Sequence, residues 1–120
     1  MKRWSILKNR VMGFAGALAL SLPLVAGAAE EKEIKGEVVD LMCYIENGAK
    51  GDGHKSCAEK CIKSGGPVGL LSGDQVYLVI GDHKTLNEEL AAHAAKTITL
   101  KGKVSERSGM KMISDAKVQK

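Results

Sequence analysis

Aromatic residues are scarce in this chain of 120 residues, which holds one Trp, two Tyr and one Phe. Trp4 and Phe14 lie in an N-terminal segment that we expect to be removed, which leaves Tyr44 and Tyr77. Single-stranded nucleic acids bind proteins largely by stacking their bases on aromatic side chains. The composition therefore argues against nucleic acid as a partner.

Long hydrophobic runs are also missing, because the mostly apolar stretch at residues 11–22 is shorter than the roughly 20 residues of a membrane-spanning helix. A basic segment without acids, residues 1–10, precedes this stretch, and the small-residue segment 26–29 follows it. These three parts make up a secretory signal peptide. We expect residues 1–28 to be cleaved, and the remaining chain to be periplasmic or secreted and not to span a membrane.

The expected mature chain has no excess of positive or negative charge. The whole sequence has 18 Lys plus Arg and 14 Asp plus Glu. Four of the bases and none of the acids lie in residues 1–28, so the rest balances at 14 against 14. The basic pI is thus no sign of nucleic-acid binding. The length of residues 29–120 predicts one domain with a modest core. A domain of this size often needs a disulfide or a metal for stability.

The mature segment predicts five strands and two short helices. Gly36 lies inside the first apolar run and marks a bend. Capping boxes, Ser56 with Glu59 and Thr85 with Glu88, start the two helices. The strands are expected at residues 34–44, 68–71, 76–80, 97–104 and 110–118, and the helices end near residues 64 and 95.

A helix between the third and fourth of five strands is typical of the OB-fold, a small Greek-key barrel. The segments IKGEVVDLMCY and TITLKGKVSERSGMKMI resemble the opening strand and closing hairpin of small exported bacterial OB-fold-like proteins. Over residues 33–118 this resemblance implies a mainly β, five-stranded barrel in the order β-α-β-β-α-β-β, and export. Those proteins are mostly of unknown function, so the resemblance implies no activity. A cysteine-bearing helical insertion at about 45–66 departs from their pattern.

All three cysteines fall within nineteen positions and form the unusual cluster of the sequence. Cys43 ends the first expected strand, and Cys57 and Cys61 are neighbours on one face of the first helix. His54 lies just before that helix. The candidate site therefore consists of Cys43, Cys57, Cys61 and His54.

One interpretation of this cluster is a metal centre. Three thiolates and one imidazole form a ligand set that suits Zn(II). Three thiolates with a methionine, for which Met42, Met110 and Met112 are candidates, would suit Cu(I). The spacing Cys-x13-Cys-x3-Cys is not that of a standard zinc finger, so the metal remains open between these two.

Two other interpretations compete with the metal. A disulfide from Cys43 to Cys57 or Cys61 would close a loop of about 15 to 19 residues and stabilise the domain by roughly 3 kcal/mol. It would leave one thiol spare, which is unusual in an exported protein. Redox chemistry at Cys57 is the third interpretation, but the pattern is not Cys-x-x-Cys.

Two functions follow from these interpretations. The first is a non-catalytic exported module that holds a soft or borderline transition metal at the cluster of three cysteines and His54. The alternative is a disulfide-stapled domain that binds a peptide, a glycan or an envelope protein on its barrel face. Since the sequence carries no phosphate-binding loop and no arguable Ser/His/Asp arrangement, we do not expect an enzyme.

Overall fold

The computed structural model describes Gly16 and residues 30–120, so the expected signal peptide, Gly16 apart, lies outside the described residues. Strands and short helices follow one another from Glu30 to Gln119. In chain order they are β1 (Glu30–Asp40), α1 (Leu41–Asn47), the 3-10 turn η1 (Asp52–His54), α2 (Lys55–Lys63), β2 (Val68–Ser72), β3 (Gln75–Val79), α3 (Asn87–Ala91), β4 (Thr97–Arg107) and β5 (Met110–Gln119).

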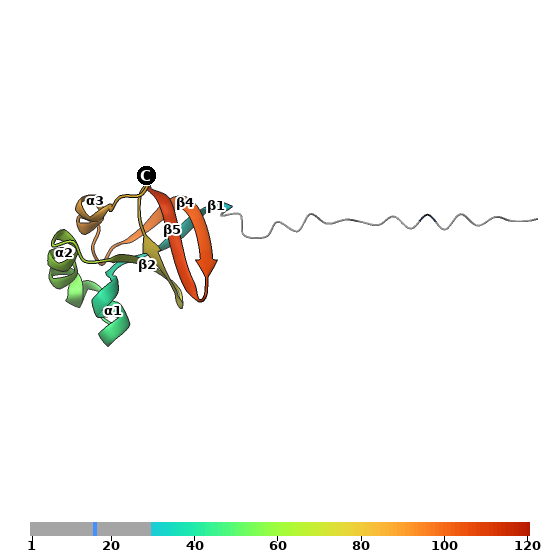
Figure 1. The fold of residues 1–120 in the computed structure, drawn as a ribbon. Coiled ribbons are helices and arrows are strands. Elements are labelled where there is room, and N and C mark those ends of the chain that lie inside the picture. Colours follow the sequence, from blue (N-terminus) through green and yellow to red (C-terminus); the bar gives the residue numbers. More distant parts are fainter. Residues whose placement is uncertain (1–15, 17–29) are drawn as a thin grey trace, which may run out of the picture.

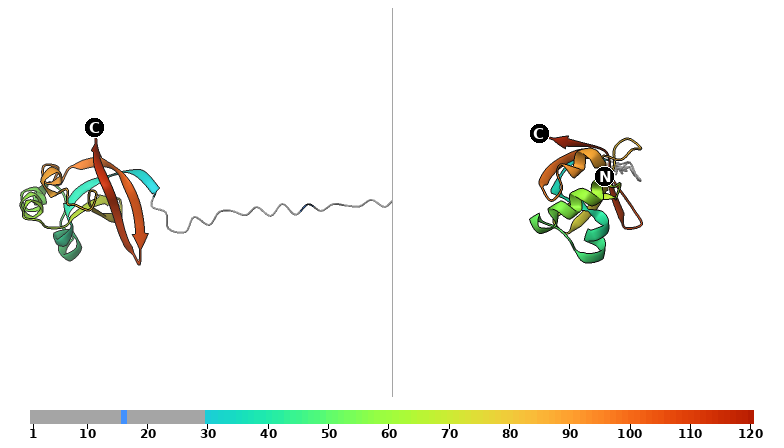
Figure 2. Two further views of the ribbon diagram at one scale, coloured as in Figure 1. Left: turned by 45° about the horizontal axis from the view of Figure 1, so that its top comes forward. Right: turned by 90° about the vertical axis from the view of Figure 1, so that its left-hand side faces the viewer.

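The five strands form a closed barrel in the order β1-β2-β3-β5-β4, with β4 pairing back to β1. Every pairing is antiparallel except that of β3 with β5. This order confirms the expected mainly β, OB-like barrel. The helices gather at one end of the barrel, and the β4–β5 hairpin extends on the other side (Figures 1 and 2).

Strand β1 closes the barrel because it pairs with two neighbours in turn. Its first part, from Glu30 to Glu37, pairs with β4, and its last part, from Glu37 to Asp40, pairs with β2. The change of partner occurs beside Gly36, where a Cβ atom would lie 2.5 Å from the carbonyl oxygen of Leu71. A side chain there would clash with the backbone of β2, so the tight crossing requires glycine.

The core joins the barrel to the helices at its end. Leu70, Leu100 and Ile113 from three strands are fully buried, and so are Ile62 of α2 and Leu90 of α3. Burial of each such side chain contributes about 1.5–3 kcal/mol relative to exposure. Helices of this length are marginal alone, so their apolar contacts with the barrel hold them in place.

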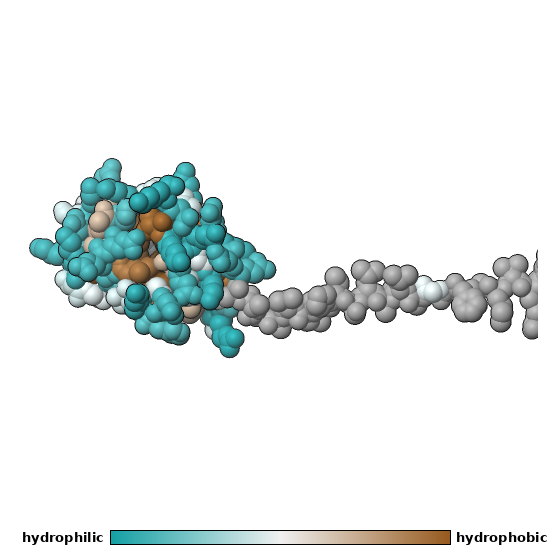
Figure 3. All heavy atoms as spheres, turned by 90° about the horizontal axis from the view of Figure 1, so that it is seen from above, coloured by the Kyte–Doolittle hydropathy of each residue, from teal (hydrophilic) through white to brown (hydrophobic). Residues whose placement is uncertain are grey.

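The surface is mostly hydrophilic on the face in Figure 3, with small apolar areas between the polar side chains. The exposed large hydrophobic side chains of the described part are Met42, Ile45 and Met110. No helix of the described residues has both the length and the apolar character needed to cross a bilayer.

The expected first strand is wrong at its end, because β1 stops at Asp40 and residues up to Tyr44 belong to helix α1. The insertion thus begins at Leu41 and not near residue 45, and the described chain has three α-helices where two were expected. The Asp40 side chain explains this, since its Oδ1 accepts a hydrogen bond from the Met42 N–H at 3.2 Å. Such an N-cap overrides the strand preference of the residues that follow.

Both expected capping boxes are also wrong. Helix α2 already begins at Lys55 as a continuation of η1, so Ser56 is inside the helix, and Glu59 bonds to Lys63 instead. Helix α3 begins at Asn87 without a side-chain cap, and it ends at Ala91 and not near residue 95. In each case the preceding turn sets the start of the helix, and the local sequence pattern does not.

Asn87 fastens the end of α2 to α3. Its Nδ2 donates hydrogen bonds to the carbonyl oxygens of Ile62, at 2.8 Å, and Gly66, at 2.7 Å. The final carbonyls of a helix have no partner within the helix. This amide therefore satisfies two backbone groups at the point where the chain leaves α2.

We predict that Asn87→Asp destabilises the protein by about 1–3 kcal/mol, because a carboxylate oxygen would replace a donor that faces two carbonyl oxygens. Urea unfolding followed by circular dichroism measures the change. Asn47→Asp, the same replacement at the exposed end of α1, is the matched control and should cost less. Equal losses in the two variants would contradict a special role for Asn87.

Candidate metal centre

Asp40 is a charged residue inside the structure, with 1% of its surface exposed at the end of β1. One of its oxygens caps α1. None of the ion pairs in residues 30–120 involves Asp40. Burial of a carboxylate without a cation is costly. The environment of Asp40 is therefore one that a bound cation would stabilise.

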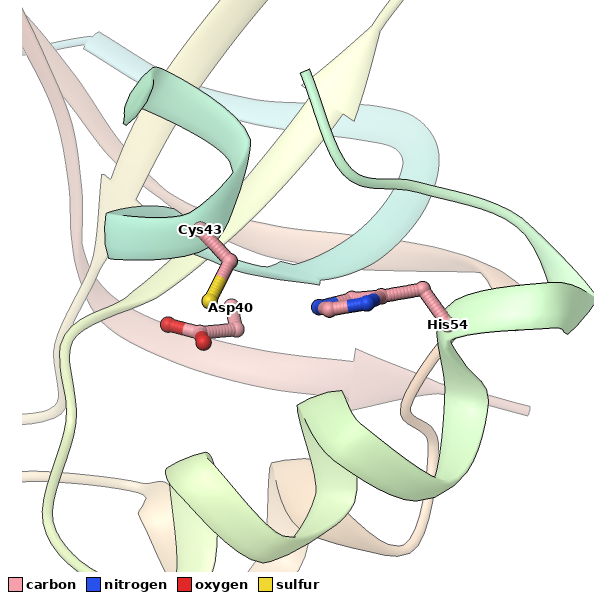
Figure 4. A group of neighbouring side chains, drawn as sticks. All are labelled: Asp40, Cys43 and His54. Carbon is pink, nitrogen blue, oxygen red and sulfur yellow. The ribbon is translucent and has the colours of Figure 1, made fainter. Parts of the chain in front are cut away.

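Cys43 and His54 bring a sulfur and a nitrogen to this carboxylate. Cys43 lies three residues beyond Asp40, one turn into α1, and His54 approaches from the junction of η1 and α2. The three ligand atoms lie within 4.8 Å of one another (Figure 4). We call Asp40, Cys43 and His54 the triad. It combines oxygen, sulfur and nitrogen donors, all of which can bind a transition metal.

The imidazole of the triad has an unsatisfied nitrogen. The Nε2 atom of His54 is buried and has no hydrogen-bond partner in the described structure. Buried polar atoms nearly always have a partner, so an exception needs an explanation. A metal ion bound between His54, Cys43 and Asp40 would supply that partner.

Negative charge around Asp40 changes the acidity of two thiols. A side-chain hydrogen bond with Asp40, followed by burial and by the charge of Asp40, raises the pKa of the Cys43 thiol to about 11. Burial first, and then the charge of Asp40, raise the pKa of Cys61. Both thiols therefore keep their protons at neutral pH until a cation replaces them.

Helix α2 places the other two cysteines differently. Cys61 is partly buried and lies one helical turn after Cys57, on the same face of α2. Its carbonyl oxygen and Asp40 Oδ1 lie 2.9 Å and 3.9 Å from the point where Gly66 would carry a Cβ, so α2 passes close to the triad. Cys57 is exposed.

The four residues predicted from the sequence thus divide into two groups. Cys43 and His54 belong to the triad, whereas Cys57 and Cys61 lie outside that three-residue group. All three cysteines fall in the described part of the chain and all are free, so the structure contains no disulfide between them. Met42 and Met110, considered as copper ligands, are 57% and 65% exposed.

A tethered loop directs His54 toward Asp40. Gly48 ends α1 with φ of 68°, and Gly51 has φ of 80°, conformations that glycine adopts without strain. The Gly51 N–H donates a hydrogen bond to Glu37 Oε2 at 2.8 Å, which ties the loop to β1. The same strand that ends in Asp40 therefore also holds the loop that delivers His54.

Asp40 is the site residue that the sequence interpretation missed. It stands between Val39 and Leu41 in an apolar run that is typical of one long strand. A charged residue in the middle of a run buried on both faces is a signal in itself, because such a position is costly without a partner. Counting it with the nearby thiols would have revealed the oxygen ligand.

Comparisons with known proteins assign no family to this chain. No protein-family model matches it, and no curated protein or solved structure matches it significantly. The assignment of an OB-like fold therefore rests on the strand order of the barrel. The chemistry of the site is argued from the residues of the triad. The resemblance to small exported OB-fold-like proteins stays a prediction.

We predict that Asp40→Asn speeds alkylation of Cys43 at pH 8 in metal-free protein. The pKa of Cys43 is about 11 mainly because of Asp40, so loss of the carboxylate lowers that pKa and raises the thiolate fraction. Iodoacetamide labelling read by peptide mass spectrometry should show a reaction that is faster by up to about tenfold, since a lower pKa also reduces nucleophilicity. Asp74→Asn in the exposed β2–β3 turn is the control. An unchanged rate would show that Asp40 does not govern the Cys43 thiol.

Proposed function

We propose that this chain is an exported, non-catalytic protein that binds one transition-metal ion through Asp40, Cys43 and His54. A single observation carries the proposal: three different donor atoms lie within 4.8 Å of one another. The buried Nε2 of His54 has no hydrogen-bond partner, and the buried Asp40 carboxylate caps α1 but has no cation beside it within residues 30–120. One cation satisfies both.

Zn(II) is the ion that the donor set favours. Zinc binds thiolate sulfur, imidazole nitrogen and carboxylate oxygen, the three donors of the triad. Cu(I) prefers a shell of soft sulfur ligands, and the central position of the hard Asp40 oxygen disfavours it. We therefore propose zinc as the resident ion, with Cu(I) as the competitor to be tested.

Cys61 is the fourth ligand in this proposal. Structural zinc sites are almost always four-coordinate, while catalytic zinc keeps one position open for water. Burial and then the charge of Asp40 raise the pKa of Cys61, so this thiol is near enough to Asp40 to be the fourth ligand. A shell of Asp40, Cys43, His54 and Cys61 is closed. Closure supports a role in holding the metal and argues against catalysis.

Charge balance supports the same assignment. The carboxylate of Asp40 keeps the Cys43 thiol protonated, because it accepts a hydrogen bond from the neutral thiol and its charge repels the thiolate. A divalent ion between them turns that repulsion into attraction. Without metal, the Asp40 carboxylate and the Cys43 sulfur lie side by side only while the thiol is protonated. A bound metal ion would stabilise the same arrangement with the thiolate.

The proposed location is outside the cytoplasm. The basic start of the sequence, the short apolar stretch and the small residues before residue 29 support export. Thiols in such a compartment are open to oxidation, and bound metal would keep them reduced. A disulfide from Cys43, which would support the peptide-, glycan- or envelope-binding alternative, is an outcome that the experiment below detects.

We predict that purified protein carries about one equivalent of zinc by elemental analysis and yields three free thiols after chelation under denaturing conditions. Cys43→Ser, His54→Gln and Asp40→Asn should each weaken zinc binding by at least about tenfold, measured by competition with a chromogenic chelator. His83→Gln, an exposed loop histidine, is the matched control and should bind normally. A protein that is two hydrogens lighter, with one alkylatable thiol and no metal, would overturn the proposal.

We further predict that zinc affinity rises with pH. The pKa of Cys43 is about 11 and burial raises the pKa of Cys61 above its ordinary value, so both thiols are protonated near neutral pH and each bound ion must displace two protons. Affinity should therefore rise by about a hundredfold per pH unit between about pH 7 and pH 8, and by about tenfold in Cys61→Ser. Titrations in zinc buffers measure both slopes. Equal slopes in the two proteins would exclude Cys61 as a ligand.

A further inference from the structure

The three thiols of this chain differ in exposure along one direction. Cys57 is exposed at the surface of α2, Cys61 is partly buried one helical turn later, and Cys43 is partly buried within the triad. Residues four apart on a helix lie on the same face, so Cys57 and Cys61 point the same way. The thiols thus form a series from solvent to the buried carboxylate.

Helix geometry places adjacent members of this series close together. Cys57 and Cys61 are one turn apart on the same face of α2, and the Cys61 carbonyl oxygen and Asp40 Oδ1 both lie within 4 Å of the point where Gly66 would carry a Cβ. Asp40 in turn lies beside Cys43 in the triad. An ion that first binds Cys57 therefore has Cys61 as its next donor, and the triad beyond it.

We infer that Cys57 is a transit ligand, through which zinc is exchanged with a thiolate-bearing metal carrier, and that it lies outside the resting shell. This inference rests on the proposed function. Cys57 is exposed, whereas Cys43 and Cys61 are partly buried. The triad and Cys61 already offer four donors, so Cys57 is not needed in the resting shell. The partner is identified by its chemistry alone, as a carrier that presents the metal on cysteine sulfurs.

The charge on α2 fits such a carrier. Zinc bound to several thiolates is an anionic complex, because each thiolate brings a negative charge. Lys55 and Lys60 are exposed on the same short helix as Cys57, whereas Lys63 is paired with Glu59 at 2.8 Å. Neither Lys55 nor Lys60 forms an ion pair within residues 30–120. Lys60 is three residues from Cys57 and so neighbours it on the helix surface, and with Lys55 on the same helix it would attract the complex toward the outer thiol.

The exchange balances without electron transfer. Cys57 loses its proton to solvent as its Sγ bonds to zinc, while one carrier sulfur leaves and takes up a proton. Cys61, Cys43, His54 and Asp40 then replace the remaining carrier sulfurs, and of these only the two thiols release a proton. Finally the bond to Cys57 breaks and its sulfur is reprotonated. With a carrier that presents four thiolates, the net change is one ion moved and four carrier sulfurs protonated, with two protons from Cys43 and Cys61 and two from water.

The test measures two quantities in Cys57→Ser: the equilibrium affinity for zinc and the rate of zinc transfer to a thiolate-bearing acceptor. Zinc-loaded full-length mature protein is mixed with a metal-free zinc-binding peptide that carries four cysteines, and transfer is followed by the fluorescence of the peptide. We expect an affinity within about twofold of the unchanged protein and a transfer rate at least about tenfold lower. Transfer to EDTA, which carries no sulfur, should be unchanged. Ser56→Ala, an exposed neighbour on the same helix, is the matched control.

Each other result has a defined meaning. An unchanged rate with the peptide would overturn the inference, and an affinity loss of about tenfold or more would make Cys57 a resting ligand instead. Either result leaves the proposed function intact, because zinc still binds. Failure of the unmodified protein to bind zinc would refute the proposed function itself. A second measurement at about 0.05 M and about 0.5 M salt should show slower transfer at high salt if Lys55 and Lys60 attract the carrier.

Discussion

The burial of one carboxylate at the end of β1 governs the structure of the site. Asp40 is 1% exposed, and it ends the strand because its side chain caps the helix that follows. That helix carries Cys43, so the same group fixes the position of the sulfur and also faces it. A single side chain thus decides where β1 stops and where α1 starts, and its buried charge makes a nearby cation favourable.

The barrel supplies the rigidity that this arrangement requires. A binding site is held best when its ligands stand on well-packed elements. Here Asp40 belongs to a strand that pairs with two neighbours, and Ile62 anchors α2 in the core. His54 is less firmly placed, since it ends the short turn η1 that follows a loop, and the hydrogen bond from the Gly51 N–H to Glu37 ties that loop to β1. The inserted helices are therefore parts of the site, held by the barrel.

The strand order was predictable from the sequence, because apolar runs, turn residues and Gly36 mark strands and bends locally. The ends of the helices were not, since they depend on turns such as η1, which leads straight into α2. Half of the predicted cluster, Cys43 and His54, does meet, because a short glycine-rich loop folds back on itself. Asp40 was missed for a physical reason: strand propensity is a weak preference, and one capping carboxylate reverses it for the residues up to Tyr44.

The direction of β1 has a practical consequence for how the protein can be attached to a label or a solid support. The strand has 11 residues and so spans up to roughly 36 Å, with Asp40 at one end and Glu30 at the other. The start of β1 lies toward the side of the barrel away from the helices (Figures 1 and 2). A label or solid support attached just before residue 30 would accordingly sit behind the barrel. The helical end would then face the solution, as a surface-based binding assay needs.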